Sequence, residues 1–157
     1  MPENQIENVI NAKLTGDAQK NALDLIAFMR ESGFSFKGFN AGKEIRWDPI
    51  YKGKGIGCMA VAEEPMLKAG VSIALWLGLD WRCDDTATTD NELKEFAWAH
   101  VVNCPQGQCK PPHCENSKNH WSIFGKEYES VCHAPLAFFS LDGEALGNIK
   151  KLLQMSK

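Results

Sequence analysis

The first 33 residues predict two helices, because their apolar residues recur every three to four positions. The first helix spans residues 3–14 and is broken by Gly16. The second begins at Asp17, which can cap it, and stops at Gly33. The apolar faces consist of residues about one turn apart: Ile6, Ile10 and Leu14 in the first helix, and Ala18, Ala22, Leu25 and Met29 in the second.

The middle of the chain changes to the alternating pattern of strands. Phe34, Phe36 and Phe39 nearly alternate with polar residues. Three further runs predict strands bounded by turn residues, namely Ile45 to Tyr51, Ile56 to Val61 and Val71 to Leu79. Short turns, such as Lys52 to Gly55, connect them, so we expect antiparallel pairing, since parallel strands need long crossovers.

The last part of the chain returns to helices. Thr89 and Glu92 fit a capping box that starts a helix with Leu93, Ala97 and His100 on one face. Leu136 to Phe139 predicts one more strand. Asp142 is placed to cap a final helix, whose apolar face contains Leu146, Ile149 and Leu153.

The predicted fold is therefore α+β, with an antiparallel sheet of three or four strands and helices packed mainly on one face. We find no internal repeat and no linker, so residues 1–157 are expected to form a single domain with an irregular Cys/His-rich segment at 103–133.

Composition and charge narrow the possible functions. Apolar residues make up 44% of the chain and charged residues 24%, which is typical of globular proteins. The net charge is −3 and no basic run occurs, which argues against nucleic-acid binding. The polar N-terminus resembles no signal segment, and the longest apolar stretch, 71–79, is far too short to span a membrane. We therefore expect a cytoplasmic protein, whose six cysteines serve metal binding, redox chemistry or plain burial.

One stretch carries chemically distinctive residues. Cys104, Cys109 and Cys114 follow one another at equal spacing among Gly and Pro residues, and Cys132 comes 18 residues later. Zinc prefers four thiolate or imidazole ligands in a tetrahedron, and short Gly/Pro loops let successive ligands fold back onto one ion. We predict that these four cysteines can form a zinc site, although they lack the tight Cys-x2-Cys pair of zinc ribbons.

Histidines near these cysteines leave the ligand set open. His100, His113 or His133 could replace one thiolate, and His100 would share a face with Cys104 if its helix continued that far. The simpler interpretation is that the cysteines are small buried apolar residues and that His100 is a hydrogen-bonded core residue.

Three functions follow from these residues. The first is a binding domain for a small ligand or a protein, with zinc ordering the polar segment. The second is a thiol- or zinc-dependent enzyme, in which three protein ligands leave one zinc position open for water. The third is a redox sensor in which Cys109 and Cys114 pair on oxidation. The sequence names no ligand and no oligomeric state.

Other patterns favour ordinary structural roles. The tryptophans, among them Trp47 and Trp76, could line a pocket for a flat or cationic ligand, but more often such residues fill a core. The Gly53 to Gly57 stretch lacks the frame of a phosphate loop and predicts a hairpin turn. The acidic residues of 80–90 lack the spacing of a calcium loop, and no catalytic triad motif is present.

Several segments resemble a group of small uncharacterised bacterial proteins that share a C-terminal Cys-rich segment and have no assigned activity. They are Asn21 to Met29, Glu95 to Ala99, the cysteine cluster, Ile123 to Tyr128, Val131-Cys132 and the final helix around Lys150 to Leu152. The resemblance covers most of the chain. It implies a cytoplasmic bacterial protein in which the cysteine cluster and the Gly-Lys-Glu-aromatic segment are shared features.

Overall fold

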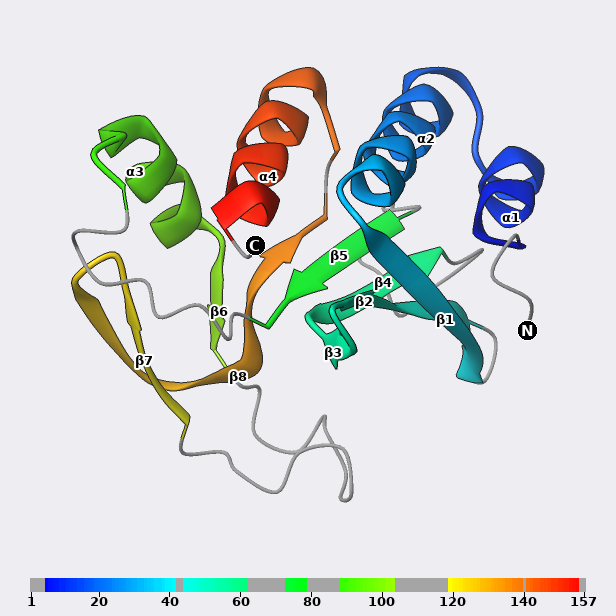
Figure 1. Cartoon of the computed structure of the whole chain (residues 1–157). Coiled ribbons are helices and arrows are strands. Elements are labelled where there is room, and N and C mark those ends of the chain that lie inside the picture. Colours follow the sequence, from blue (N-terminus) through cyan, green and yellow to red (C-terminus); the bar gives the residue numbers. More distant parts are fainter. Residues whose placement is uncertain are drawn as a thin grey trace.

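A computed structural model describes residues 5–41, 44–61, 73–78, 88–103, 119–139 and 141–155 (Figure 1). Within these residues the chain forms four helices and one eight-stranded sheet. The helices are α1 (Gln5–Lys13), α2 (Gly16–Glu31), α3 (Asn91–Ala99) and α4 (Gly143–Met155). The strands are β1 (Phe34–Ala41), β2 (Glu44–Tyr51), β3 (Lys54–Gly55), β4 (Gly57–Val61), β5 (Ile73–Leu77), β6 (Val101–Asn103), β7 (Asn119–Ile123) and β8 (Lys126–Phe138).

The sheet is antiparallel at every described pairing, in the order β1-β2-β4-β5-β8-β6. The short β3 pairs with β2, and β7 pairs with β8. The α+β class is confirmed, but the prediction of three or four strands is too low. The difference comes mainly from β6, and from β7 and the first half of β8, which fall in the segment 103–133 that the sequence led us to expect as irregular.

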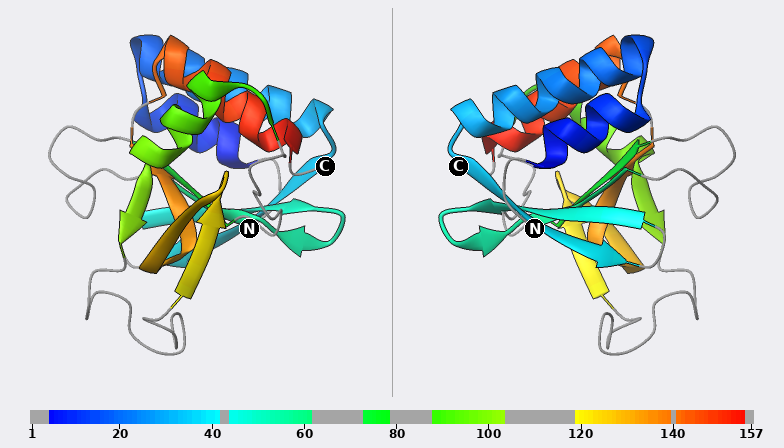
Figure 2. Two further views of the ribbon diagram at one scale, coloured as in Figure 1. Left: turned by 90° about the vertical axis from the view of Figure 1, so that its left-hand side faces the viewer. Right: turned by 90° about the vertical axis from the view of Figure 1, so that its right-hand side faces the viewer.

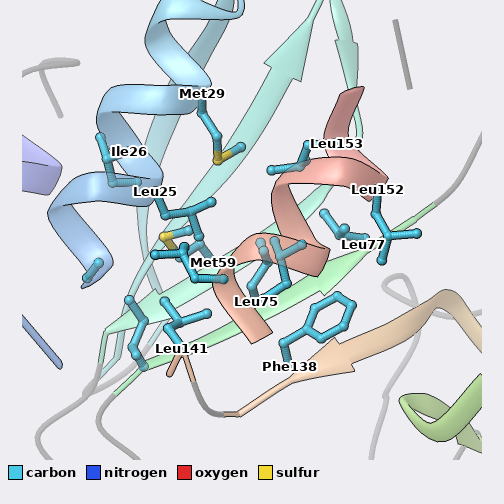
Figure 3. Packing of buried hydrophobic residues seen from close by; sticks show 14 of the residues in the cluster. Leu25, Ile26, Met29, Met59, Leu75, Leu77, Phe138, Leu141, Leu152 and Leu153 are labelled. Atoms are coloured by element: carbon cyan, nitrogen blue, oxygen red, sulfur yellow. The ribbon is translucent and has the colours of Figure 1, made fainter. Parts of the chain in front are cut away.

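All four helices lie on the same side of the sheet, as the two opposite side views of Figure 2 show. Side chains from α2 and α4 meet those of the central strands in a buried core (Figure 3). On the sheet, Trp47, Met59, Leu75 and Phe138 share this face because their positions are paired across β2, β4, β5 and β8. Burial of such side chains is the main favourable contribution to folding, at roughly 25 cal/mol per Å² of apolar surface.

Polar contacts place the helices relative to one another. The Arg30 guanidinium of α2 donates two hydrogen bonds to the Glu7 carboxylate of α1, at 2.6 and 3.2 Å. Burial alone would raise the pKa of Glu7, but the Arg30 hydrogen bond and charge hold that pKa below its usual value. Lys151 of α4 donates to Asp90 at the start of α3 at 3.1 Å, and Lys150 donates to Asp24 of α2 at 2.7 Å.

Two of the predicted helix caps are corrected and one is confirmed. The cap of α3 is Asp90 and not Thr89, since the Asp90 carboxylate accepts from the Leu93 amide at 3.0 Å. The α2 helix begins at Gly16, so Asp17 lies in its first turn and its cap, Thr15, makes no side-chain hydrogen bond. Asp142 caps α4 as expected by accepting from the Ala145 amide at 2.9 Å.

Candidate functional site

The two residues that flank 104–118 lie on either side of one residue of β8. Asn103, the last residue of β6, pairs with Val131, and Asn119, the first residue of β7, pairs with the same Val131 from the other side. Neighbouring strands are about 4.8 Å apart, so Asn103 and Asn119 are separated by roughly 10 Å. Asn103 and Asn119, which flank residues 104–118 in the sequence, therefore both lie beside Val131, which directly precedes Cys132.

Cys132 itself begins an irregular stretch of β8. Between Val101 and Asn103, β6 advances by two residues while the paired part of β8, Leu136 back to Val131, advances by five. The register therefore shifts, through a bulge or another irregularity, in the stretch of β8 that contains Cys132 and His133. Bulges bend a strand and redirect its side chains, and they are frequent next to functional sites. The sheet thus interrupts its regular pairing where the fourth predicted zinc ligand occurs.

The structure describes the predicted zinc ligands to different extents. Cys104, Cys109, Cys114 and His113 lie outside the described residues. For Cys132 and His133 the structure describes the backbone, as part of β8, and not the side chains. Among the residues whose side chains are described, no cluster of three or more His, Cys, Asp or Glu residues could hold a metal.

His100 is described in full and does not share a helix face with Cys104, because α3 ends at Ala99 and β6 follows. Its Nδ1 lies 2.7 Å from the Phe96 carbonyl oxygen, and its ring packs against Phe96 and Phe138 at centroid distances of 4.3 and 5.0 Å. The backbone of His100 accepts from the Ala137 amide, at the opposite end of β6 from Asn103. This environment is that of a partly buried histidine with a hydrogen bond and aromatic neighbours, and it is nearer to the simpler of the two interpretations.

A cluster of aromatic side chains lies on the β7–β8 hairpin and α3. We call Trp98, Trp121, Lys126 and Tyr128 the hairpin cluster. Trp121 and Tyr128 are directly paired, and Lys126 shares their face of the hairpin, since side chains two residues apart point the same way. The hairpin tip lies beneath α3 (Figure 1), where the Trp98 Nε1–H donates to the Ile123 carbonyl at 2.7 Å.

Two polar atoms of the hairpin cluster are unusual. Trp121 Nε1 and Tyr128 Oη are both buried, and neither has a hydrogen-bond partner within the described part of the chain. The Lys126 ammonium lies 5.3 Å from the centroid of the Trp98 ring and 5.7 Å from that of Tyr128, close enough for cation–π attraction. Sequence reasoning missed this cluster, although Trp121, Ile123, Lys126 and Tyr128 already show the alternation of a hairpin.

The remaining tryptophans do not form one pocket wall. Trp47 is fully buried on the helix-covered face of β2, as the core interpretation predicts. Trp76 is next to Leu75 on β5 and therefore points to the opposite face, where its ring contacts Phe139 edge-on at 5.8 Å. Trp81 lies outside the described residues. The Lys52-Gly53 stretch is a hairpin turn between β2 and β3, as expected.

Comparisons with known protein families, with curated protein sequences and with solved structures find no match to this chain. The resemblance to small bacterial proteins with a Cys-rich segment therefore stays a prediction. Among the described helices, none has both the length and the apolar character that crossing a membrane requires.

Proposed function

We propose that this chain is a non-enzymatic binding domain for a small ligand or a protein partner, with a structural zinc ion that orders its cysteine-rich segment. The ion would be held by Cys104, Cys109, Cys114 and Cys132 as thiolates. When bound, zinc would supply folding free energy to a segment too polar to bury itself. Coordination by four thiolates also leaves no open position for a substrate, which distinguishes this role from a catalytic zinc.

The observation that carries the proposal is the double pairing of Val131. Asn103 directly precedes Cys104, and Val131 directly precedes Cys132. Because Asn103 and Val131 are paired, the first and last predicted ligands each adjoin one member of a cross-strand pair, from which the antiparallel strands continue in opposite directions. Asn119, which follows residues 104–118 in the sequence, pairs with Val131 from its other side. Cys104 and Cys132 thus each follow a residue of the paired strands β6 and β8. The irregular pairing at Cys132 is a feature often found next to functional sites.

Elemental analysis of the purified protein tests the proposal. We expect about one zinc per chain, and Cys132→Ser should lower that value well below one because it removes one of four thiolates. Cys58→Ser is the matched control, since Cys58 lies on β4, outside the cysteine-rich segment, and its replacement should leave the zinc content unchanged.

The same preparation distinguishes the alternatives. If the protein is free of zinc and Cys109 and Cys114 form a disulfide after mild oxidation, the result favours the redox sensor over the zinc site. If the protein is free of zinc and all six thiols remain reduced, both the zinc site and the redox sensor are ruled out. The cysteines are then structural residues.

A further inference from the structure

The hairpin cluster contains more hydrogen-bond donors than acceptors. The indole of Trp121 can only donate, and the hydroxyl of Tyr128 donates readily. Both atoms are buried without a partner in the described residues, although almost all buried polar atoms in proteins are hydrogen-bonded. Since the two residues are a cross-strand pair, their unmet donors belong to one face of one hairpin. This part of the molecule therefore lacks an acceptor.

The same face also carries a positive charge. The Lys126 side chain is exposed, and its ammonium rests over the rings of Trp98 and Tyr128. No carboxylate of the described residues forms an ion pair with it. An anionic group that met Lys126 would neutralise this charge and could accept from the neighbouring donors in the same step.

Two aromatic rings complete the environment. Trp98 and Tyr128 are half-buried, and the orientation of Trp98 is fixed by its hydrogen bond to the Ile123 carbonyl. Ring faces of this kind favour flat, apolar groups stacked against them. Donors, a cation and aromatic faces thus occur together on α3 and the β7–β8 hairpin.

We infer that the hairpin cluster binds a small planar carboxylate. Trp121 Nε1–H and Tyr128 O–H donate to its oxygens, Lys126 neutralises its charge, and its flat body stacks on Trp98. To reach the buried donors, the ligand displaces the Lys126 ammonium from the two rings. The inference rests on the binding role proposed above, but not on zinc, because all four side chains lie in the described part of the structure.

Benzoate is a suitable probe, and the side-chain N–H signals of the tryptophans are the readout in a ¹H–¹⁵N NMR titration. We expect a saturable downfield shift of the Trp121 Nε1–H signal, identified by its loss in Trp121→Phe. Trp47 Nε1–H, buried in the core on β2, and Trp98 Nε1–H, already bonded to Ile123, serve as internal controls and should move little. Benzamide, which is neutral, should bind at least about tenfold more weakly, because hydrogen bonds and contacts to a charged group are the stronger ones.

Substitution of Tyr128 separates a binding role from a structural one. Tyr128→Phe removes only the hydroxyl, so we expect benzoate affinity to fall about tenfold while the thermal midpoint stays equal or rises, since a buried donor without a partner is also removed. Tyr51→Phe on β2, the other tyrosine, should change neither quantity. Lys126→Gln provides a second variant, exposed enough to leave folding intact, and should weaken benzoate but not benzamide.

Three outcomes would overturn the inference. One is no movement of the Trp121 signal at millimolar benzoate. Another is equal loss of stability and binding in Tyr128→Phe. The third is preference for benzyltrimethylammonium over benzoate, which would make the rings a site for organic cations. Zinc content measured on the same sample distinguishes the two proposals. Protein that contains zinc but does not bind benzoate contradicts only the carboxylate site.

Discussion

Gly57 on β4 lies where the neighbouring strand leaves no room for a side chain. A Cβ atom at this position would lie 1.9 Å from the backbone carbonyl oxygen of Trp76 on β5, so β5 would have to move. Gly57→Ala should therefore lower the free energy of unfolding by about 1–3 kcal/mol or more, as overpacking of a core does. Urea denaturation measures this directly.

Gly147→Ala is the matched control for that substitution. Gly147 lies within α4, and no atom of a neighbouring residue comes within 4 Å of the place that an alanine methyl group would occupy. Alanine should therefore raise stability by roughly 0.5–1 kcal/mol through its higher helix propensity. A Gly57→Ala protein as stable as the parent would contradict the close approach of β4 and β5.

The surroundings of Asp48 on β2 disfavour the ionised form of its carboxyl group. Burial raises the pKa of Asp48, and the nearby charges of Lys37 and Arg46 offset this only in part. A folded-state pKa above the unfolded value means that the folded protein binds the proton more tightly. The stabilisation that results from protonated Asp48 is therefore complete below the pKa of Asp48 in the unfolded chain. It is lost as pH rises through the pKa of Asp48 in the folded protein.

Asp48→Asn should therefore stabilise the protein at pH 7 and have little effect near pH 3, where the parent residue is already protonated. Because solvent screens a partly exposed carboxylate, the gain at pH 7 should be only about 0.5 kcal/mol. Chemical denaturation at both pH values tests this. A loss of stability at pH 7 would mean that attraction to Lys37 and Arg46 outweighs the cost of burial.

Among the elements, α4 depends on a cap that the sequence identified correctly. Asp142→Ala removes the acceptor for the Ala145 amide and should cost about 1 kcal/mol of unfolding free energy. Asp142→Asn keeps an acceptor oxygen and should cost much less. Equal losses in the two variants, measured by urea denaturation, would assign the effect to the charge at the helix N-terminus instead.

Helices and strands with a regular spacing of apolar residues were predicted well. Both N-terminal helices, the strands around Trp47, Met59 and Leu75, and α4 lie close to where apolar spacing placed them. The start of α3 was missed by one residue because Thr89 and Asp90 are both good caps, and only Asp90 also bonds to Lys151 of α4. Tertiary contacts of this kind cannot be read from local sequence.

The β7–β8 hairpin was missed for a different physical reason. Its turn is Phe124-Gly125, with φ values of 48° and 80°. Hairpin turns of this type normally use Asn-Gly or Asp-Gly, because a bulky residue strains at positive φ. Here Phe124 is fully buried, so its packing in the core outweighs the local cost. A sequence search for standard turn residues therefore passes over this hairpin.

For the whole molecule, the position of the cysteine-rich segment was predictable only in part. The sequence identified the thiols, but their spacing could not show that Asn103 and Asn119 both pair with Val131. That convergence results from long-range strand pairing, in which β8 contacts β5, β6 and β7. The pairing of β7 with β8 also brings Trp121 and Tyr128 of the hairpin cluster together.

X-ray absorption at the zinc K edge of the purified protein tests the proposed metal site most directly. A shell of four sulfur atoms at about 2.3 Å is expected if Cys104, Cys109, Cys114 and Cys132 hold the ion. A shell dominated by oxygen or nitrogen at about 2.0–2.1 Å, or protein that retains no zinc, would contradict it.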